Sequence, residues 1–367
     1  MPHVHYVLPN LGYAAAAKQV SLVAPALVRP GWSAEVSSLA GDGPFVHPLR
    51  TANVPVVTSR TRDVRNWVRL RHGIPKLGQG LVHAFGMTVL RRLWLATLGQ
   101  RRPPVVLSLT GREVLSRWDR RCLSIVSCVL VPHQQAAGAL IAQLIPAERI
   151  RVVPPAVTSR SGFQPDQLSG QVGNLTYPAG APLIVTAGMM PDRHRLLQAV
   201  WAFEFLRYPH ADAHLVVVGD GPGRARLEAN ALGLAPEGSR IHFVGARSDL
   251  SATLGLADVV AVLQPWGGVN VALEAMAAGR AVIAAWTPDL AAIVGDRETG
   301  LLVEPNDAVA AAKAIRKLLL DPAERRRLGD AARAHVNEHH GIEKVVGVLE
   351  AVYGEAFTST RSELWAK

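Results

Sequence analysis

Short runs of hydrophobic, often β-branched residues alternate with longer amphipathic stretches along the first half of the chain. Each run is four to seven residues long, which is the length of a buried strand. The alternation predicts a parallel sheet whose strands are joined by helices. The predicted strands of this half lie at His3–Pro9, Ala34–Ser38, Gly80–Ala84, Val105–Leu109, Ser127–Val131 and Ile150–Val153.

The pattern stops and then restarts near the middle of the chain. Residues 159–182 are rich in Gly, Pro, Ser and Gln and show no sustained period, which is typical of a linker. Helical periods follow at Leu196–Leu206 and Ala308–Leu320. A second series of predicted strands lies at Leu183–Ala187, His214–Gly219, Arg240–Val244, Val259–Leu263, Ala281–Ala284 and Gly300–Val303.

The two series predict an α/β chain with two doubly wound, Rossmann-like domains that face each other across a cleft. We expect an N-terminal domain at 1–160, a linker at 161–182, a second domain at 183–340 and a C-terminal helix or tail at 341–367. Ligands of open parallel sheets bind outside the carboxyl ends of the strands. The loops that follow the strands are therefore the segments in which to search for a site.

The composition is that of a folded chain without a membrane span. With 367 residues, 49% of them hydrophobic, the chain is long enough for two cores. No apolar run reaches the roughly 20 residues of a membrane span, and the first residues lack the basic start and apolar stretch of a signal peptide. We therefore expect a cytoplasmic location. Cys122 and Cys128 are the two cysteines, too few for a disulfide framework or a cysteine metal cluster.

Positive charge is concentrated in the first half. Residues 1–160 carry 20 Lys and Arg against 6 Asp and Glu, whereas the remainder carries 19 against 23. This asymmetry suggests an anionic partner: nucleotide phosphates, an acidic lipid surface or nucleic acid. Residues 60–76 place apolar side chains among six Lys and Arg, which is compatible with peripheral membrane contact or with a set of solvated arginines. No nucleic acid is expected, because no aromatic strand platform or known binding motif is present.

The strongest candidate loop lies within residues 264–279. A buried strand ends there in Gly267 and Gly268, and a helix is predicted to begin near Val269. The two glycines permit close approach of a ligand, and the first amides of a helix attract phosphate. Glu274 lies in the first two turns among small apolar residues, where a carboxylate needs a partner such as a ribose diol. The alternative is a position that is favourable only because of the helix dipole.

Three further loops follow predicted strands. Gly188 ends one strand, and Arg193 beyond it could grip a diphosphate or form part of a solvated basic turn. The segment 217–224 matches a dinucleotide fingerprint only weakly, because it lacks the third glycine. Gly245 and Ala246, after the next strand, offer backbone groups that could recognise the edge of a base.

Taken in order, these segments carry a family resemblance. Residues 183–340 contain VVVGDGPGRARLE, IHFVGARSDL, LEAMAAGRAVIA and ETGLLVEPND. This series resembles the nucleotide-binding half of the family 4 glycosyltransferases (glycosyl transferases group 1), which have the GT-B fold. The first half is similar to that family more loosely, at residues 3–18, 81–86 and 149–157.

The resemblance implies transfer of a sugar from a nucleotide-sugar donor with retention of configuration. The acceptor stays open between a glycan, a lipid-linked glycan and a small molecule. No metal and no cofactor are implied, because Arg side chains and helix termini would offset the charge of the leaving diphosphate. Glu274 would hold the ribose hydroxyls, and Gly12 would approach the phosphate from the first domain. The other residues that the resemblance places at the sugar donor are Gly188, Arg193, Gly245, Ala246, Gly267, Gly268 and Asn270.

The chain departs from the family pattern at several polar positions. Trp266 stands where the family usually has a glutamate, Met189 where it usually has an arginine, and Thr110 where a histidine is often found. His83, at the carboxyl end of a predicted strand, is our candidate to take over a polar catalytic role beside Glu274. A buried core histidine is the alternative.

Other functions remain open at this point. The departures are compatible with a catalytically silent protein that retains a nucleotide or glycan pocket. A sugar-nucleotide epimerase can share the two-domain architecture. An NAD-dependent dehydrogenase ranks last, because the glycine fingerprint is incomplete.

Overall fold

The computed structural model of the chain forms two compact units. Unit 1 combines Met1–Ala156 with Ile342–Lys367, and unit 2 is Val157–Gly341. The basic segment 60–76, Arg193 and most of the predicted linker lie outside the described residues. Within those residues no helix is both long and apolar enough to cross a bilayer. The structure describes residues 2–12, 15–28, 31–58, 80–100, 102–158, 171–172, 175–178, 180–190, 196–234, 240–247 and 249–358.

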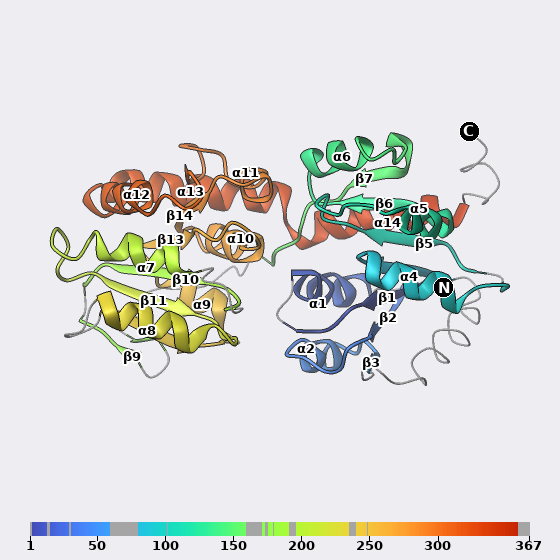
Figure 1. The fold of residues 1–367 in the computed structure, drawn as a ribbon, viewed down its shortest axis with the longest axis horizontal. Coiled ribbons are helices and arrows are strands. Elements are labelled where there is room, and N and C mark those ends of the chain that lie inside the picture. The colour runs from blue at the N-terminus through green and yellow to red at the C-terminus, as the bar shows by residue number, and fades with distance from the viewer. Residues whose placement is uncertain are drawn as a thin grey trace. The chain divides into compact units, whose positions relative to one another are not determined.

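Unit 1 is built on a parallel sheet with the strand order β3-β2-β1-β4-β5-β6-β7 (Figure 1). Its strands are β1 (His3–Leu8), β2 (Ser33–Ser38), β3 (Val56–Thr58), β4 (Gly80–Phe85), β5 (Val105–Ser108), β6 (Val126–Val131) and β7 (Ile150–Val152). Its helices are α1 (Ala15–Leu27), α2 (Val46–Thr51), α4 (Met87–Ala96), α5 (Arg117–Cys122), α6 (Gln134–Ile141) and α14 (Ile342–Thr358), with short 3-10 turns at Leu123–Ile125 and Ala147–Arg149.

Two hydrophobic cores lie on the two faces of this sheet. Helices α4, α5 and α6 pack on one face, and α1 and α14 pack together on the other. The C-terminal helix α14 thus completes the core of the first unit rather than of the unit that precedes it in sequence. Tyr353, which is fully buried, carries this contact by packing beside Tyr6 of β1.

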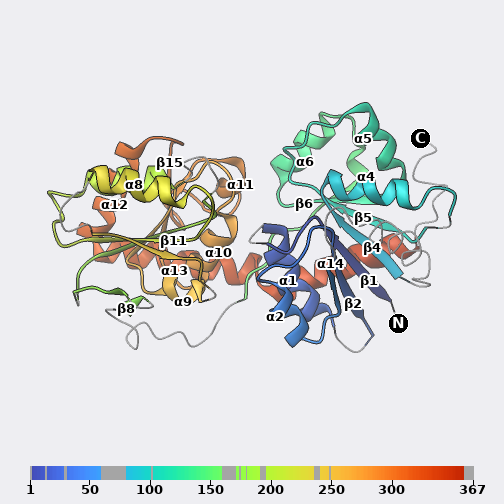
Figure 2. The ribbon, with the colours of Figure 1, turned by 60° about the horizontal axis from the view of Figure 1, so that its bottom comes forward.

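Unit 2 repeats the plan with the strand order β12-β11-β10-β13-β14-β15. Its strands are β10 (Leu183–Ala187), β11 (His214–Val218), β12 (Ile241–Gly245), β13 (Val259–Val262), β14 (Ala281–Ala285) and β15 (Leu301–Val303), and a small hairpin pairs β8 (Gln171–Val172) with β9 (Leu175–Thr176). Its helices are α7 (Leu197–Glu204), α8 (Arg224–Leu234), α9 (Leu250–Gly255), α10 (Val269–Ala277), α11 (Pro288–Ala291), α12 (Ala308–Leu320) and α13 (Pro322–His339). Figure 2 shows its strand β11 between helices α8 and α9.

The predicted α/β class with two doubly wound parallel sheets is confirmed. The central strands β10, β13 and β14 are apolar and buried on both faces. Each could therefore be predicted from a continuous hydrophobic run, without alternation of apolar and polar residues. Part of the expected linker at 161–182 forms the β8–β9 hairpin, and Tyr177 after it is buried in the core of unit 2.

Candidate functional site

The candidate site of unit 2 lies where the strand order reverses. Strands β10 and β13 are neighbours, and the chain proceeds outward from them in opposite directions. Open α/β sheets bind their ligands outside the carboxyl ends of such a strand pair. Gly188 follows β10, and the segment from Gln264 to Gly268 follows β13. The sequence-predicted residues of these two loops are therefore brought to the same edge of the sheet.

Backbone hydrogen bonds tie three of the loops to one another. Gly188 N–H donates to the carbonyl of Val218 over 3.0 Å, and Gly219 N–H donates to the carbonyl of Gly245 over 2.8 Å. A Cβ atom on Gly219 would lie only 1.9 Å from the carbonyl oxygen of Gly188. The glycine-rich segment 219–223 is thus explained by close packing of the loops, which agrees with its weak match to a dinucleotide fingerprint.

Gln264 joins the loops after β10 and β13. Its side chain is only 3% exposed, and its Nε2 donates to the carbonyl of Ala187 over 3.1 Å, whereas Oε1 has no hydrogen-bond partner among the described residues. A Cβ atom on Gly268 would meet Val262 Cγ1 at 2.5 Å and Gln264 Nε2 at 2.9 Å, so glycine is required there. Gln264 was not among the site residues predicted from the sequence. The available signal was a polar residue directly after a fully apolar strand.

Helix α10 begins directly after this glycine pair. Gly268 has a φ of +84° and occupies the N-cap position without a capping side chain. The first amides of an α-helix have no partner within the helix, and their dipoles favour an anion. A Cβ atom on Gly267 would meet no atom of the described residues within 4 Å, so this turn is open to a ligand. The predicted helix start near Val269 is confirmed.

Glu274 is buried on α10, with 6% of its surface exposed. The hydroxyl of Ser251 on α9 donates to Glu274 Oε2 over 2.5 Å. This contact orients the carboxylate group. Ser251 was missed in the sequence, because its contact spans 23 residues and two helices.

A guanidinium group lies beside the loop after β12. Arg224 Nη1 is 3.2 Å from the point where a Cβ on Gly245 would be, and Arg224 Nη2 donates to the carbonyl of Phe243 over 3.3 Å. Arg224 Nε also donates to Glu228 Oε1 over 2.7 Å, and this hydrogen bond raises the pKa of Arg224. Gly245 and Ala246 thus have a fixed cation as their neighbour.

The remaining predicted residues do not all join this group. Arg193 lies outside the described residues, and Asn270 lies in the first turn of α10. Trp266 is 49% exposed next to the glycine pair, and Met189 is also exposed. Gly12 belongs to unit 1, where its N–H donates to Asn10 Oδ1 over 3.0 Å.

His83 also belongs to unit 1 and is only 3% exposed. Its Nδ1 lies 2.7 Å from the hydroxyl of Tyr353 on α14, and its Nε2 lies 2.7 Å from the hydroxyl of Ser108 on β5. Burial lowers the pKa of His83 to about 3. Both ring nitrogens are therefore occupied inside a core, which favours the alternative of a structural histidine.

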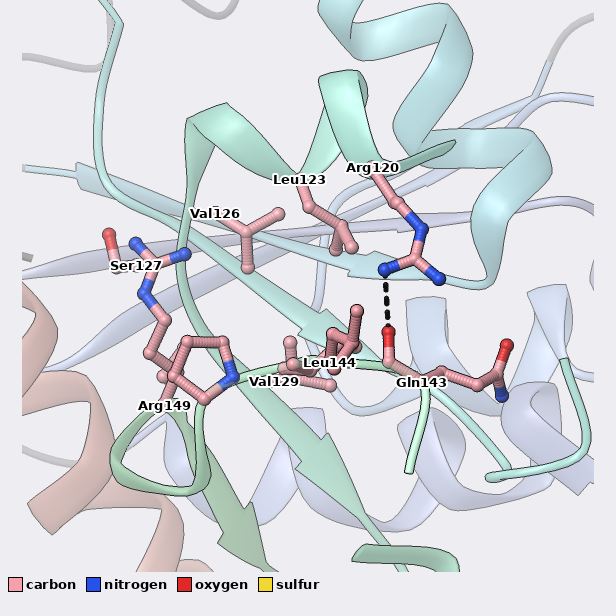
Figure 3. Close-up of a pocket in the computed structure, with 11 residues that line it drawn as sticks. Arg120, Leu123, Val126, Ser127, Val129, Gln143, Leu144 and Arg149 are labelled. Atoms are coloured by element: carbon pink, nitrogen blue, oxygen red, sulfur yellow. Dashed lines mark hydrogen bonds between the residues drawn. The ribbon is translucent and has the colours of Figure 1, made fainter. Parts of the chain in front are cut away.

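A cavity of about 130 Å³ lies elsewhere in unit 1. Figure 3 shows it between α5, the start of β6 and the turn before β7, with Arg120 and Arg149 on its walls. These are the amino ends of the strands, opposite to the edge at which open α/β sheets bind ligands. The cavity is therefore separate from the candidate site.

Family comparison supports the resemblance seen in the sequence. The model described as "Glycosyltransferase Family 4" matches residues 3–160, and that described as "Glycosyl transferases group 1" matches residues 173–335. A D-inositol 3-phosphate glycosyltransferase of Salinispora tropica is 36% identical over 318 residues, which cover 80% of this chain and 62% of that protein. The lipopolysaccharide core biosynthesis glycosyltransferase LpsE of Rhizobium meliloti is 33% identical over 167 residues, 44% of this chain and 46% of LpsE. The chain thus spans less than two thirds of the length of these relatives.

Solved structures share the whole architecture. Anabaena HepE in complex with UDP has a TM-score of 0.79 at 19% identity, and the comparison covers 97% of this chain and 100% of HepE. A glycosyltransferase from Rickettsia africae has a TM-score of 0.80 at 17% identity, with 98% and 99% covered. At these identities the likeness shows the GT-B fold. Together with the two family models, it establishes that the chain belongs to the family 4 glycosyltransferases, glycosyl transferases group 1.

Proposed function

We propose that the chain transfers a sugar from a nucleotide-sugar donor to an acceptor with retention of configuration, and that unit 2 binds the sugar donor. The observation that carries this proposal is the arrangement at the switch point: an open glycine turn at the start of α10, followed by the buried and oriented carboxylate of Glu274. The names of the curated relatives support glycosyl transfer. We further propose a uridine nucleotide, because HepE binds UDP and UDP-glucose on the same fold.

In this proposal the ribose hydroxyls donate to Glu274, and the diphosphate lies at Gly267, Gly268 and the first amides of α10. Arg193 supplies positive charge to the phosphates. The remaining predicted contacts are made by Gly188, Gly245, Ala246 and Asn270 of unit 2 and by Gly12 of unit 1.

The proposed reaction takes place on one face of the sugar. The bond from the anomeric carbon to the diphosphate oxygen breaks, and its electron pair leaves with the nucleotide. The acceptor oxygen forms its bond to the same carbon, and its proton passes to the leaving phosphate. The leaving group thus acts as the base, and we assign His83 a structural role rather than a catalytic one.

The proposal includes no metal and no cofactor. Arginine side chains and helix amides that are fixed before the reaction can stabilise the charge that develops on a leaving diphosphate. We also propose a cytoplasmic protein that makes peripheral contact with a membrane, with a glycan or lipid-linked glycan as the acceptor.

A catalytically silent binding protein is the second candidate. It is favoured by Trp266 and Met189, two exposed apolar side chains at positions where the family usually has polar ones. A silent protein would bind the nucleotide sugar without releasing the sugar.

Incubation with UDP-, GDP- and ADP-sugars, with and without a chelator, tests the proposal. Thermal melting reports binding, because a ligand at 100 times its Kd stabilises the folded state by about 2.7 kcal/mol. We expect one nucleotide class to raise the melting temperature and its sugar to be released slowly in both conditions. Binding without release would support the silent protein, and a product that is an isomeric sugar nucleotide would support an epimerase. No binding to any of these compounds would contradict the proposal.

A further inference from the structure

Helices α4 and α5 of unit 1 present aromatic and basic side chains together. The rings of Trp94 and Trp118 meet edge to face with their centroids 5.0 Å apart. The guanidinium of Arg121 lies over Trp94, 5.9 Å from the ring centroid. Trp118 and Arg121 are both exposed. Amphipathic aromatic rings next to arginine are the side chains typical of a membrane interface.

Apolar side chains continue this face into solvent. Leu95 and Leu98 lie on the outer side of α4 and after its end, and both are exposed. Val114, in the segment before α5, is 92% exposed. Transfer of these exposed side chains from water to apolar surroundings is favourable, because it removes apolar surface from water.

Leu144 lies next to α5, in the turn that follows α6. It is 80% exposed and has a φ of +67°, a conformation that non-glycine residues rarely adopt. Arg120 Nη1 donates to the carbonyl of Gln143 over 2.8 Å, so the turn that carries Leu144 is fastened to α5 (Figure 3). The left-handed backbone at this position closes α6, because the N–H groups of Leu144 and Ile145 donate to the carbonyls of Ile141 and Leu140 over 2.8 and 3.2 Å. The cap does not use the leucine side chain, which stays exposed to water.

The charge of this region is strongly positive. The stretch 87–121 contains eight arginines against two carboxylates. One carboxylate, Asp119, is buried and accepts both Arg91 Nε at 2.6 Å and Arg91 Nη2 at 2.9 Å. The other, Glu113, accepts the N–H of Gly111 over 2.9 Å within its own loop. The acidic groups are therefore engaged locally, and the outward charge is carried by arginine.

We propose that this face, called the α4–α5 surface, docks on an anionic phospholipid bilayer. A bilayer offers both partners that the surface lacks in the monomer: headgroup phosphates for the arginines and an apolar boundary for the leucines, valine and tryptophan. The inference rests on the proposed function, since it assigns the surface through which a transferase reaches a membrane-bound acceptor. The surface consists of Leu95, Leu98, Val114, Arg117, Trp118, Arg120, Arg121 and Leu144.

Sedimentation of the full chain with vesicles tests the proposal without sugar donor or turnover. We expect wild-type protein to bind vesicles of phosphatidylcholine with one quarter phosphatidylglycerol at low salt, and to bind pure phosphatidylcholine much less. Each arginine near an anionic surface contributes about fivefold in binding, so Arg117→Ser with Arg121→Ser lowers the partition coefficient about 25-fold. Arg226→Ser with Arg326→Ser removes the same charge from exposed positions of unit 2 and leaves binding unchanged.

A second pair of substitutions isolates the apolar contribution. Val114→Ser with Leu144→Asn weakens binding about tenfold, and the loss persists in 1 M salt, where charge interactions are screened. Both positions are exposed, and asparagine tolerates the left-handed conformation at Leu144, so folding is preserved. Leu232→Ser with Tyr208→Ser, at exposed positions of unit 2, is the matched control and keeps wild-type binding.

Three results would overturn the inference. Wild-type protein could stay in the supernatant with anionic vesicles, or the unit 2 controls could lose as much binding as the unit 1 variants. The third result is binding to an oligonucleotide at salt concentrations at which the protein does not bind vesicles. Sugar-donor binding measured by thermal melting on the same preparations reports the proposed function separately. Loss of vesicle binding with intact donor binding therefore contradicts only the α4–α5 surface.

Discussion

Acid is expected to destabilise unit 1 through His83. The imidazole is buried between the hydroxyls of Tyr353 and Ser108, and this burial lowers its pKa from 6.5 to about 3. Below pH 6.5 the unfolded chain binds a proton at this position that the folded unit does not bind. The contribution of His83 to stability is therefore fully present above pH 6.5 and is lost as the pH falls from 6.5 towards 3.

The size of the effect follows from the same values. One pKa unit corresponds to 1.36 kcal/mol, so His83 removes at most about 1.4 kcal/mol of unfolding free energy per pH unit in this window. Between pH 6.5 and 4.5 we expect a loss of about 2 to 3 kcal/mol from this residue alone. A glutamine at position 83 offers a hydrogen-bond donor and an acceptor to the same hydroxyls, but it does not titrate.

Urea unfolding of wild type and His83→Gln at pH 7.0, 5.5 and 4.5 measures this contribution. Pulsed hydrogen exchange of peptides from β4 and α14 reports unit 1 alone. His5, whose pKa burial also lowers, is present in both proteins and its effect cancels. We expect the variant to lose about 2 to 3 kcal/mol less than wild type over this range. Equal acid losses in the two proteins would refute the reasoning.

Gly219→Ala and Ser251→Ala test the packing of unit 2, with Gly233→Ala as a control. Gly219→Ala places a Cβ atom 1.9 Å from the carbonyl oxygen of Gly188, so we expect the free energy of unfolding to fall by about 2 to 4 kcal/mol in thermal or urea unfolding. Gly233 lies in α8, where a Cβ atom would meet no described atom within 4 Å. Gly233→Ala is therefore neutral or stabilising by up to about 1 kcal/mol. A Gly219→Ala protein as stable as wild type would contradict the close contact. Ser251→Ala removes the hydroxyl that orients Glu274, at a cost of about 1 kcal/mol, and weakens nucleotide binding severalfold in a titration. Unchanged affinity would show that Glu274 needs no such support.

Local patterns account for the strands that were predicted correctly. Strands β10, β13 and β14 are buried on both faces, so each gives a continuous apolar run of the expected length. Strand β3 has only three residues at the edge of its sheet, and β8 and β9 have two each, which is too short for any hydrophobic period to appear.

Contacts between distant residues could not be predicted in this way. A helix or tail was expected at 341–367, but the sequence did not indicate that Tyr353 would meet His83 across 270 residues. Gln264 and Ser251 were overlooked for the same reason, since their partners lie 77 and 23 residues away. The sequence showed which loops follow the strands, whereas the hydrogen bonds that orient Gln264 and Glu274 depend on tertiary packing.

Calorimetric titration with UDP tests the central claim most directly. It uses wild type, Glu274→Ala and, as a control at an exposed position of unit 2, Glu304→Ala. Hydrogen bonds to a charged group contribute about 1.5 to 3 kcal/mol, so we predict that Glu274→Ala raises the Kd about 10- to 100-fold while Glu304→Ala leaves it unchanged. Equal Kd values for Glu274→Ala and wild type would contradict the claim that the switch point of unit 2 binds the nucleotide through Glu274.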